Sequence, residues 1–239
     1  MAQTRVQVRE QPSDQEIDHR IRGIHRALVK AYGPIPQRPS RDPTEELILT
    51  ILSQNTSDHN SGLAFDRLRE RFPTWESVRD GDESQIAEAI RPGGLAQIKA
   101  GRIQDILRAI TVERGNLDLH FLSQMGLDDA LAWLESFKGV GPKTAACVLL
   151  FALGRPTMPV DTHVLRVSRR LGLLPVNASA DQAHRLLRQV VSPELIYELH
   201  LLLVLHGRRV CRPSLPRCFA CAVCVWCQFP HKTPPPPQA

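Results

Sequence analysis

Four thiols stand close together late in the chain, at Cys211, Cys218, Cys221 and Cys227, with the spacing C-x6-C-x2-C-x5-C. Cysteines this dense predict either a metal site or disulfides. The N-terminal residues form no apolar signal region, and no apolar run reaches the length of a bilayer span. We therefore expect an intracellular protein without membrane contact, cytoplasmic or at the nucleoid in a prokaryote. A reducing compartment favours metal binding by these thiols.

A fifth thiol, Cys224, leaves the ligand set open. From Cys218 to Cys227 the segment reads C-x2-C-x2-C-x2-C, close to a ferredoxin-like run whose last gap is one residue short. Four thiolates can also hold zinc. The sixth cysteine, Cys147, falls in an apolar stretch and is expected to be a buried small hydrophobe.

A second candidate for chemistry is Lys143, which follows Gly139-Val140-Gly141-Pro142. Two glycines permit a tight turn, and Pro142 can open a helix. The unpaired N–H groups of such a turn suit a phosphate, as in a helix-hairpin-helix that grips a DNA backbone without reading sequence. A plain turn between helices is the alternative. A lysine in the first helical turn faces the positive end of the dipole, which suits a nucleophilic amine; the alternative is a solvated surface lysine.

A third candidate is Asp161, in the segment Val160-Asp161-Thr162-His163-Val164. Asp161 precedes an expected helix and can be its N-cap. It can also be a carboxylate that takes a proton or stabilises a positively charged sugar. His163 is expected to be an ordinary helix residue.

Helices must position these residues. Asp42-Pro43-Thr44-Glu45 predicts an N-cap, a proline at the first helical position and a capping box. Gly94 and Gly115 delimit a helix over 96–114. Further helices are expected over 127–137, 142–153, 162–172, 180–191 and 193–206. No alternating pattern predicts a sheet, so the fold class is all-α, in two helical lobes. Residues 1–16 are expected to be a flexible leader and 231–239 a proline-rich tail.

Together these segments resemble the endonuclease III family of DNA repair glycosylases. The resemblance rests on residues 139–145, residues 160–164, His206-Gly207-Arg208 and the cysteine spacing, in matching order over roughly residues 40–228. It implies the helix-hairpin-helix glycosylase fold. A six-helix barrel would span 36–154, and a second lobe, 17–35 with 155–230, would hold a 4Fe–4S cluster. The resemblance selects Cys211, Cys218, Cys221 and Cys227 as ligands and leaves Cys224 free.

The resemblance also implies an activity, that of a bifunctional DNA N-glycosylase and abasic-site lyase of base excision repair acting on oxidised pyrimidines. Lys143 would attack C1′ of a flipped nucleotide and form a Schiff base, and β-elimination would cut the strand. Asp161 would help to activate Lys143 and stabilise the cationic sugar. The same fold acting on mismatched bases or pyrimidine dimers, and a non-catalytic DNA-binding iron–sulfur protein, are the alternatives.

The implied partner is double-stranded DNA with damaged bases or abasic sites, lying in a cleft between the lobes, and we expect a monomer. The net charge of +5 fits a polyanion but does not establish one. Backbone contacts are expected at Gly139, Val140 and Gly141.

Two side chains are candidates to fill the gap left by a flipped base. The family commonly uses glutamine there, and alignment places the shorter Asn55 at this position, with Gln54 as a possible substitute. Leu95 would be a second, apolar wedge, or else a helix-cap leucine packed on the core. In the cysteine loop, Arg212 and Arg217 are expected to meet phosphates or to remain solvated.

Overall fold

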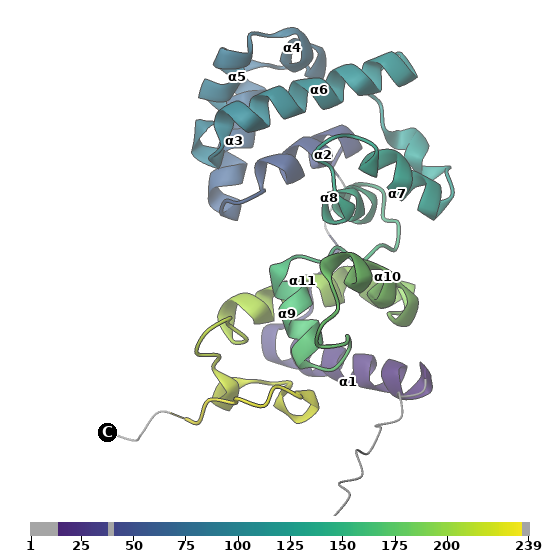
Figure 1. The fold of residues 1–239 in the computed structure, drawn as a ribbon, viewed down its shortest axis with the longest axis vertical. Helices are drawn as coiled ribbons and strands as arrows, with labels where there is room; N and C mark the ends of the chain where they lie inside the picture. The colour runs from purple at the N-terminus through teal and green to yellow at the C-terminus, as the bar shows by residue number, and fades with distance from the viewer. Residues whose placement is uncertain (1–13, 38–40, 236–239) are drawn as a thin grey trace, which may run out of the picture. The chain divides into compact units, whose positions relative to one another are not determined.

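The computed structural model describes residues 14–37 and 41–235, and every regular element in that part is a helix (Figure 1). The predicted all-α class is confirmed. Residues 1–13 of the expected leader and 236–239 of the expected tail lie outside the described residues. The chain divides into two compact units, Pro36–Asp161 and a discontinuous unit made of Met1–Ile35 with Thr162–Ala239. Within the described residues, no helix combines the length and apolar character needed to cross a membrane.

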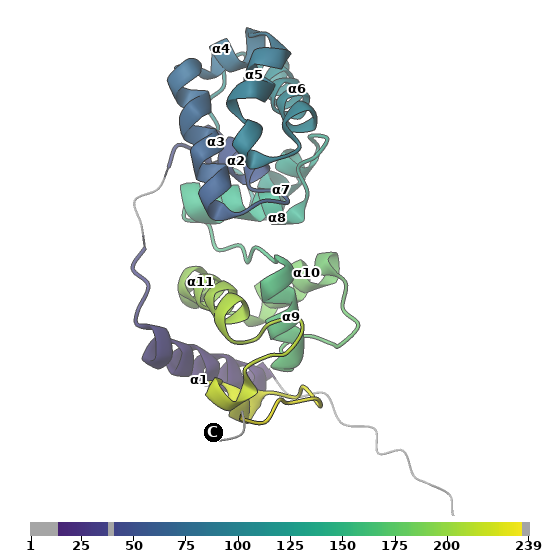
Figure 2. The same cartoon turned by 90° about the vertical axis from the view of Figure 1, so that its left-hand side faces the viewer.

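The Pro36–Asp161 unit packs its helices around one apolar core (Figure 2). Fully buried side chains of this core include Ile48, Ile51, Leu68, Ile103 and Leu107. The α-helices are α2 (Pro43–Leu52), α3 (Asp58–Arg71), α4 (Trp75–Asp80), α5 (Glu83–Ala89), α6 (Ala96–Arg114), α7 (Leu127–Glu135) and α8 (Pro142–Cys147). Two 3-10 turns, η1 (Arg91–Gly93) and η2 (His120–Ser123), and a π-helical turn, η3 (Val148–Ala152), complete the unit.

Local signals place the helix starts. The Asp42 carboxylate accepts hydrogen bonds from the N–H groups of Thr44 and Glu45, at 2.9 and 3.1 Å, which confirms the predicted N-cap of α2. The Glu45 carboxylate lies 3.9 Å from Arg69 Nε on α3. Helix α6 ends at Arg114, and the left-handed Gly115 after it is the predicted stop.

The stretch predicted as one helix over 142–153 is an α-helix followed by a π turn. Helix α8 ends at Cys147, and η3 continues to Ala152. Beyond η3, the N–H of Arg155 donates to the carbonyl of Leu149 at 2.8 Å. Such π turns frequently occur at functional sites, and this one begins directly after α8.

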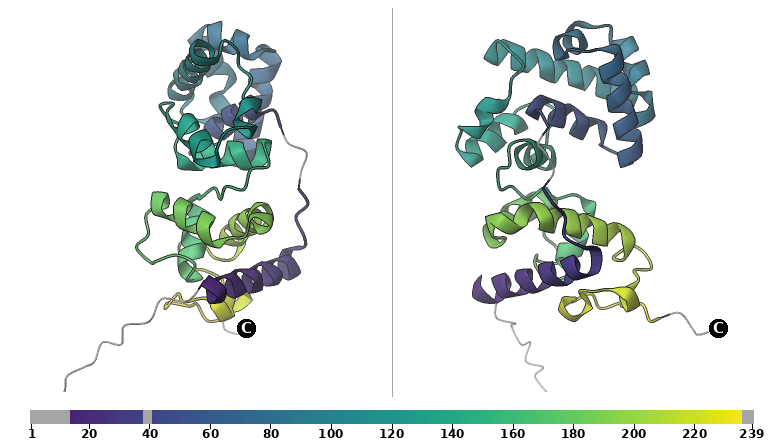
Figure 3. Two further views of the ribbon diagram at one scale, coloured as in Figure 1. Left: turned by 90° about the vertical axis from the view of Figure 1, so that its right-hand side faces the viewer. Right: turned by 180° about the vertical axis from the view of Figure 1, so that it is seen from behind.

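The discontinuous unit joins α1 (Asp14–Tyr32) to α9 (Thr162–Arg170), α10 (Ala180–Val190) and α11 (Pro193–Arg209), followed by the short turns η4 (Cys218–Ala220) and η5 (Cys224–Trp226). Helix α11 packs on both α9 and α1 (Figure 3). The indole of Trp226 lies against Gly23 of α1, where a Cβ would come within 2.8 Å of the ring. The cysteine-rich segment is therefore packed directly on the N-terminal helix.

Candidate active site and cysteine centre

The turn between α7 and α8, residues 136–141, has the hairpin geometry predicted from its glycines. Gly139 adopts φ +94°, a left-handed conformation that glycine tolerates best. The side chains of Phe137 and Val140 are 7% and 4% exposed and anchor the turn in the core. Val140 donates its N–H to the Phe137 carbonyl at 3.0 Å. Among the described residues the N–H groups of Gly139 and Gly141 meet no acceptor, so these two amides are the ones that a phosphate can engage.

Lys143 is the second residue of α8 and is half-buried. One helical turn later, burial raises the pKa of the Cys147 thiol to about 11. Lys143 opposes this rise through its charge and a side-chain hydrogen bond, whereas Glu46 and Asp161 add to it through their negative charges. Lys143, Asp161 and Glu46 therefore all lie close to one buried thiol. Both residues that the sequence singled out for chemistry therefore act electrostatically on the Cys147 thiol.

Glu46 is the residue at this site that the sequence reasoning missed. Its side chain on α2 is 9% exposed and accepts a hydrogen bond from Thr50 Oγ1 at 3.2 Å. Burial raises the pKa of the Glu46 carboxyl, while Thr50 and the charges of Arg41 and Lys143 act in the opposite direction. A glutamate and a threonine four residues apart, with only apolar residues between them, were the available signal, because this spacing puts both on one face of α2.

Both expected wedge residues occupy exposed, left-handed positions. Asn55 has φ 55°, and Leu95 has φ 52° and is 54% exposed, so Leu95 is not packed on the core. Left-handed non-glycine residues cost conformational energy and cluster at functional sites. The neighbouring Gln54 is half-buried, and its amide is hydrogen-bonded to Arg102 and Gly139. Asn55 is thus the exposed one of the two candidate wedge amides.

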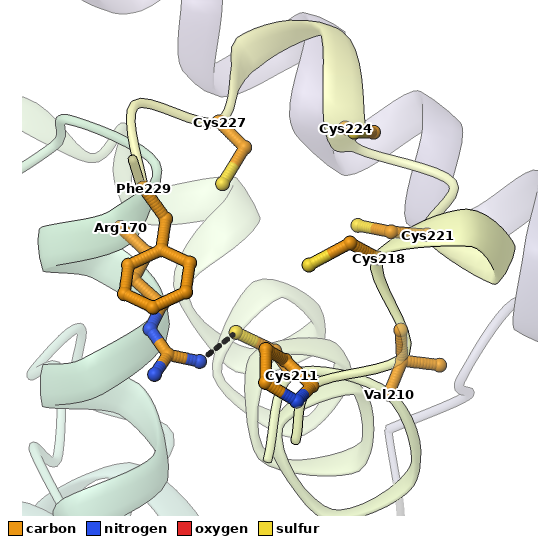
Figure 4. A pocket seen from close by; sticks show the side chains of 9 residues that line it. Arg170, Val210, Cys211, Cys218, Cys221, Cys224, Cys227 and Phe229 are labelled. Atoms are coloured by element: carbon orange, nitrogen blue, oxygen red, sulfur yellow. Dashed lines mark hydrogen bonds between the residues drawn. The ribbon is translucent and has the colours of Figure 1, made fainter. Parts of the chain in front are cut away.

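The cysteine segment surrounds a pocket that is lined by Arg170, Val210, Pro216, Phe229 and the five thiols Cys211, Cys218, Cys221, Cys224 and Cys227. In Figure 4 the sulfurs of four cysteines face a common space. These four are Cys211, Cys218, Cys221 and Cys227. No three His, Cys, Asp or Glu side chains of the described residues converge on a single ion. Zinc needs its thiolates at ~2.3 Å from one point. Four thiolates can also hold a multi-iron cluster, in which each sulfur binds a different iron.

Charge and hydrogen bonding around these sulfurs suit thiolates. Burial raises the pKa of Cys221 to about 11, so a thiolate there requires a compensating cation. His206 Nε2 lies 3.5 Å from Cys221 Sγ, and the Tyr32 hydroxyl lies 2.8 Å from His206 Nδ1. Burial lowers the pKa of His206 to about 4, so the ring is neutral near neutral pH, and with Tyr32 donating to Nδ1 it presents Nε2–H to the sulfur. Arg170 Nη1 lies 3.4 Å from Cys211 Sγ (Figure 4).

The two loop arginines differ in their surroundings. Arg212 is exposed and lines an open pocket with His163, Gly207 and Arg208. Arg170 stabilises the loop that carries Arg212 by donating to the carbonyls of Arg212 and Pro213, at 2.8 and 3.1 Å. Arg217 is also exposed but does not line this pocket. Two guanidinium groups in one open pocket suit an anion, and sequence spacing alone did not pair Arg212 with Arg208.

Comparison with known proteins identifies the family. Residues 48–193 match the family described as HhH-GPD superfamily base excision DNA repair protein. The chain belongs to the HhH-GPD superfamily. The predicted resemblance to endonuclease III is confirmed within this superfamily, because the chain is 31% identical to endonuclease III of Sulfolobus acidocaldarius over 80% of its own length and 83% of that protein.

Two further relatives of this HhH-GPD chain extend the comparison. It is 41% identical to a putative DNA glycosylase of Arabidopsis thaliana over 68% of its length, and it spans about half, 55%, of that plant protein. Among solved structures it resembles a trapped endonuclease III–DNA covalent intermediate, with a TM-score of 0.75 and 28% identity, covering 91% of this chain and 97% of the other. The HhH-GPD fold is thus present over nearly the whole chain.

Proposed function

We propose that this HhH-GPD protein is a bifunctional DNA N-glycosylase and abasic-site lyase in which Lys143 is the nucleophile. The observation that carries the proposal is the position of Lys143 directly after the hairpin, where its charge acts on Glu46 and, together with that of Asp161, on Cys147. The Lys143 amine attacks C1′ of a flipped nucleotide, a C1′–N bond to lysine forms, and the bond to the base breaks. The resulting Schiff base acidifies the C2′ proton, whose loss eliminates the 3′ phosphate.

The neighbouring groups supply the electrostatics of this reaction. Asp161 accepts a proton as the Lys143 ammonium becomes a free amine, and its negative charge stabilises the cationic sugar. The N–H groups of Gly139 and Gly141 hold a backbone phosphate, which fixes the strand without reading its sequence. Damaged double-stranded DNA is the partner in this proposal, bound by a monomer.

Oxidised pyrimidines are the proposed lesion class, supported by the likeness to endonuclease III over most of both chains. The exposed Asn55 at the wedge position is shorter than glutamine, so its contact with the opposite base has a shorter reach. A panel of duplexes with thymine glycol, oxidised purines, uracil mismatches and pyrimidine dimers tests the class. Faster release of any other base than of thymine glycol would replace this substrate assignment.

The test of the reaction is borohydride trapping on a duplex with one abasic site. Reduction converts the Schiff base to a stable covalent adduct, which we expect with the wild type and not with Lys143→Ala. Lys30→Ala, an exposed lysine at the end of α1, is the matched control and should trap normally. A wild-type protein that forms no adduct, or a Lys143→Ala variant that still does, would refute the proposal.

We also propose that Cys211, Cys218, Cys221 and Cys227 hold a 4Fe–4S cluster whose role is structural, since the cluster would fix the loop that carries Arg212. The four sulfurs that face a common space in Figure 4 and the likeness to endonuclease III support this ligand set. Iron and sulfide analysis with a visible absorption spectrum tests it. We expect Cys224→Ser to keep the cluster and Cys221→Ser to lose it. A colourless protein containing zinc would exclude the cluster.

A further inference from the structure

The side-chain amide of Gln54 connects three elements of the Pro36–Asp161 unit. Its Oε1 accepts a hydrogen bond from Arg102 Nη1 of α6 at 2.8 Å. Its Nε2 donates to the Gly139 carbonyl of the hairpin at 3.3 Å and to Thr144 Oγ1 of α8 at 3.4 Å. Arginine only donates and a carbonyl only accepts, so these partners fix which end of the amide carries oxygen. Gln54 is therefore attached on both sides and precedes the exposed Asn55 directly.

Arg102 also supports the hairpin by packing. The aliphatic and guanidinium atoms of Arg102 occupy the space that a Cβ on Gly139 would take. A glycine is therefore needed at position 139 for two reasons, the left-handed φ of +94° and the close approach of Arg102. A bond from a charged donor is shorter and stronger than a neutral one, which matches the 2.8 Å separation from Gln54. The hairpin and the segment before Asn55 are held by the same arginine.

One turn earlier on α6, Lys99 holds the other end of the same region. Its side chain is 1% exposed, and Nζ donates to the carbonyls of Leu52 and Gly93 at 2.7 and 2.8 Å. Leu52 ends α2, and Gly93 precedes the turn that carries Leu95. Residues three apart lie on one face of a helix. One face of α6 therefore fixes both wedge turns and the hairpin.

We propose that Gln54 and Arg102 form a positioning pair that ties the Asn55 loop to the hairpin preceding Lys143. The inference rests on the proposed function and deepens it. In a duplex, the wedge must enter the gap opposite the flipped nucleotide while the lysine meets its C1′, so the two must keep a fixed separation. A misplacement of ~1 Å costs up to about a hundredfold in rate. Neither Gln54 nor Arg102 reacts; the pair keeps the wedge and the amine in register.

The test compares two substrates that differ in whether a wedge is needed. A single-stranded oligonucleotide with an abasic site has no opposite base, so the pair should not affect its cleavage. With an abasic duplex, we expect Gln54→Leu and Arg102→Met each to slow single-turnover β-elimination by about tenfold, the effect of one charge-assisted hydrogen bond. Because the two act as one unit, the double variant should be about tenfold slower as well, and not about a hundredfold.

The controls separate positioning from loss of folded protein. Arg108→Met changes an arginine on the same helix that is half-exposed and lies 3.8 Å from Asp105, and it should behave as the wild type. Borohydride trapping on the single strand counts the active molecules, so every duplex rate is divided by that fraction. Equal slowing on both substrates, multiplicative effects in the double variant, or unchanged duplex rates would overturn the pairing. A wild type that traps neither substrate would instead remove the proposed function.

Discussion

Replacing Lys99 by methionine removes a buried cation from the junction of α2, η1 and α6. Methionine is unbranched and of similar length, so the variant keeps the packing and loses the two N–H donors. The carbonyls of Leu52 and Gly93, now 2.7 and 2.8 Å from Nζ, lose that partner. We expect a less stable Pro36–Asp161 unit, because both carbonyls lie in a buried contact.

The size of the effect follows from two opposing contributions. A buried acceptor left without its donor costs ~1–3 kcal/mol, so two of them cost ~2–6 kcal/mol. Burial lowers the pKa of Lys99, which means that its charged form is disfavoured where it lies, and removing the charge recovers part of the loss. We expect a net destabilisation of about 2–4 kcal/mol, which is a fall of about 5–15 °C in the melting temperature.

Thermal and urea unfolding of Lys99→Met and of the exposed control Lys138→Met measure this loss. The pH dependence of the stability difference is a second test. The folded pKa of Lys99 lies below its ordinary 10.5, so between the two values the unfolded chain binds more protons and this group makes wild-type stability rise with pH. The difference in unfolding free energy between the wild type and Lys99→Met should therefore widen as the pH rises toward 10.5. A Lys99→Met variant as stable as the wild type, or a stability difference that shrinks as the pH rises, would refute the reasoning.

Three further predictions follow from the site. Gly139→Ala should lose about 1–3 kcal/mol of stability and weaken duplex binding, because alanine meets Arg102 at a left-handed φ; unchanged unfolding and anisotropy titrations would contradict this. Glu46→Gln should stabilise the protein at neutral pH and do so less near pH 4, because the raised pKa of the Glu46 carboxyl makes wild-type stability fall as pH rises above 4.5. Urea unfolding at both pH values measures this, and an equal difference in unfolding free energy between variant and wild type at the two pH values would disprove it. Arg212→Ala should weaken binding to all DNA sequences alike and lower the salt slope by about one; a constant slope would show no phosphate contact.

The helix starts were predictable because their signals are local. Asp42, Thr74 and Asp82 each cap the helix that follows through bonds to residues two or three positions away. The π turn after Cys147 was not predictable, since its residues, Val148–Ala152, are as apolar as those of an ordinary buried α-helix. A helix cap depends on residues that are close in the sequence, whereas a π turn depends on what the helix packs against.

The site residues also divide into those indicated by local sequence and those set by tertiary contacts. Lys143 and Asp161 stand in short segments whose residue types and order are informative by themselves. The Gln54–Arg102 pair was missed because its two members are 48 residues apart in the sequence, and Glu46 was missed although its partner Thr50 is only four residues away. Sequence periodicity can place a polar residue on a buried face. It does not say which other polar residue will meet it there.

The contact between Trp226 and α1 has a consequence for how the chain is made. Arg20 donates to the carbonyl of Trp226 at 3.4 Å across 206 residues, and Gly23 receives the indole. A ribosome releases α1 early, with Ile21, Ile24 and Leu28 awaiting their partners, and Pro36–Asp161 can fold while synthesis continues. If the proposed 4Fe–4S cluster is present, we therefore expect iron to be loaded after translation has passed Trp226. Truncation before this residue would remove a partner of the N-terminal helix as well as a thiol.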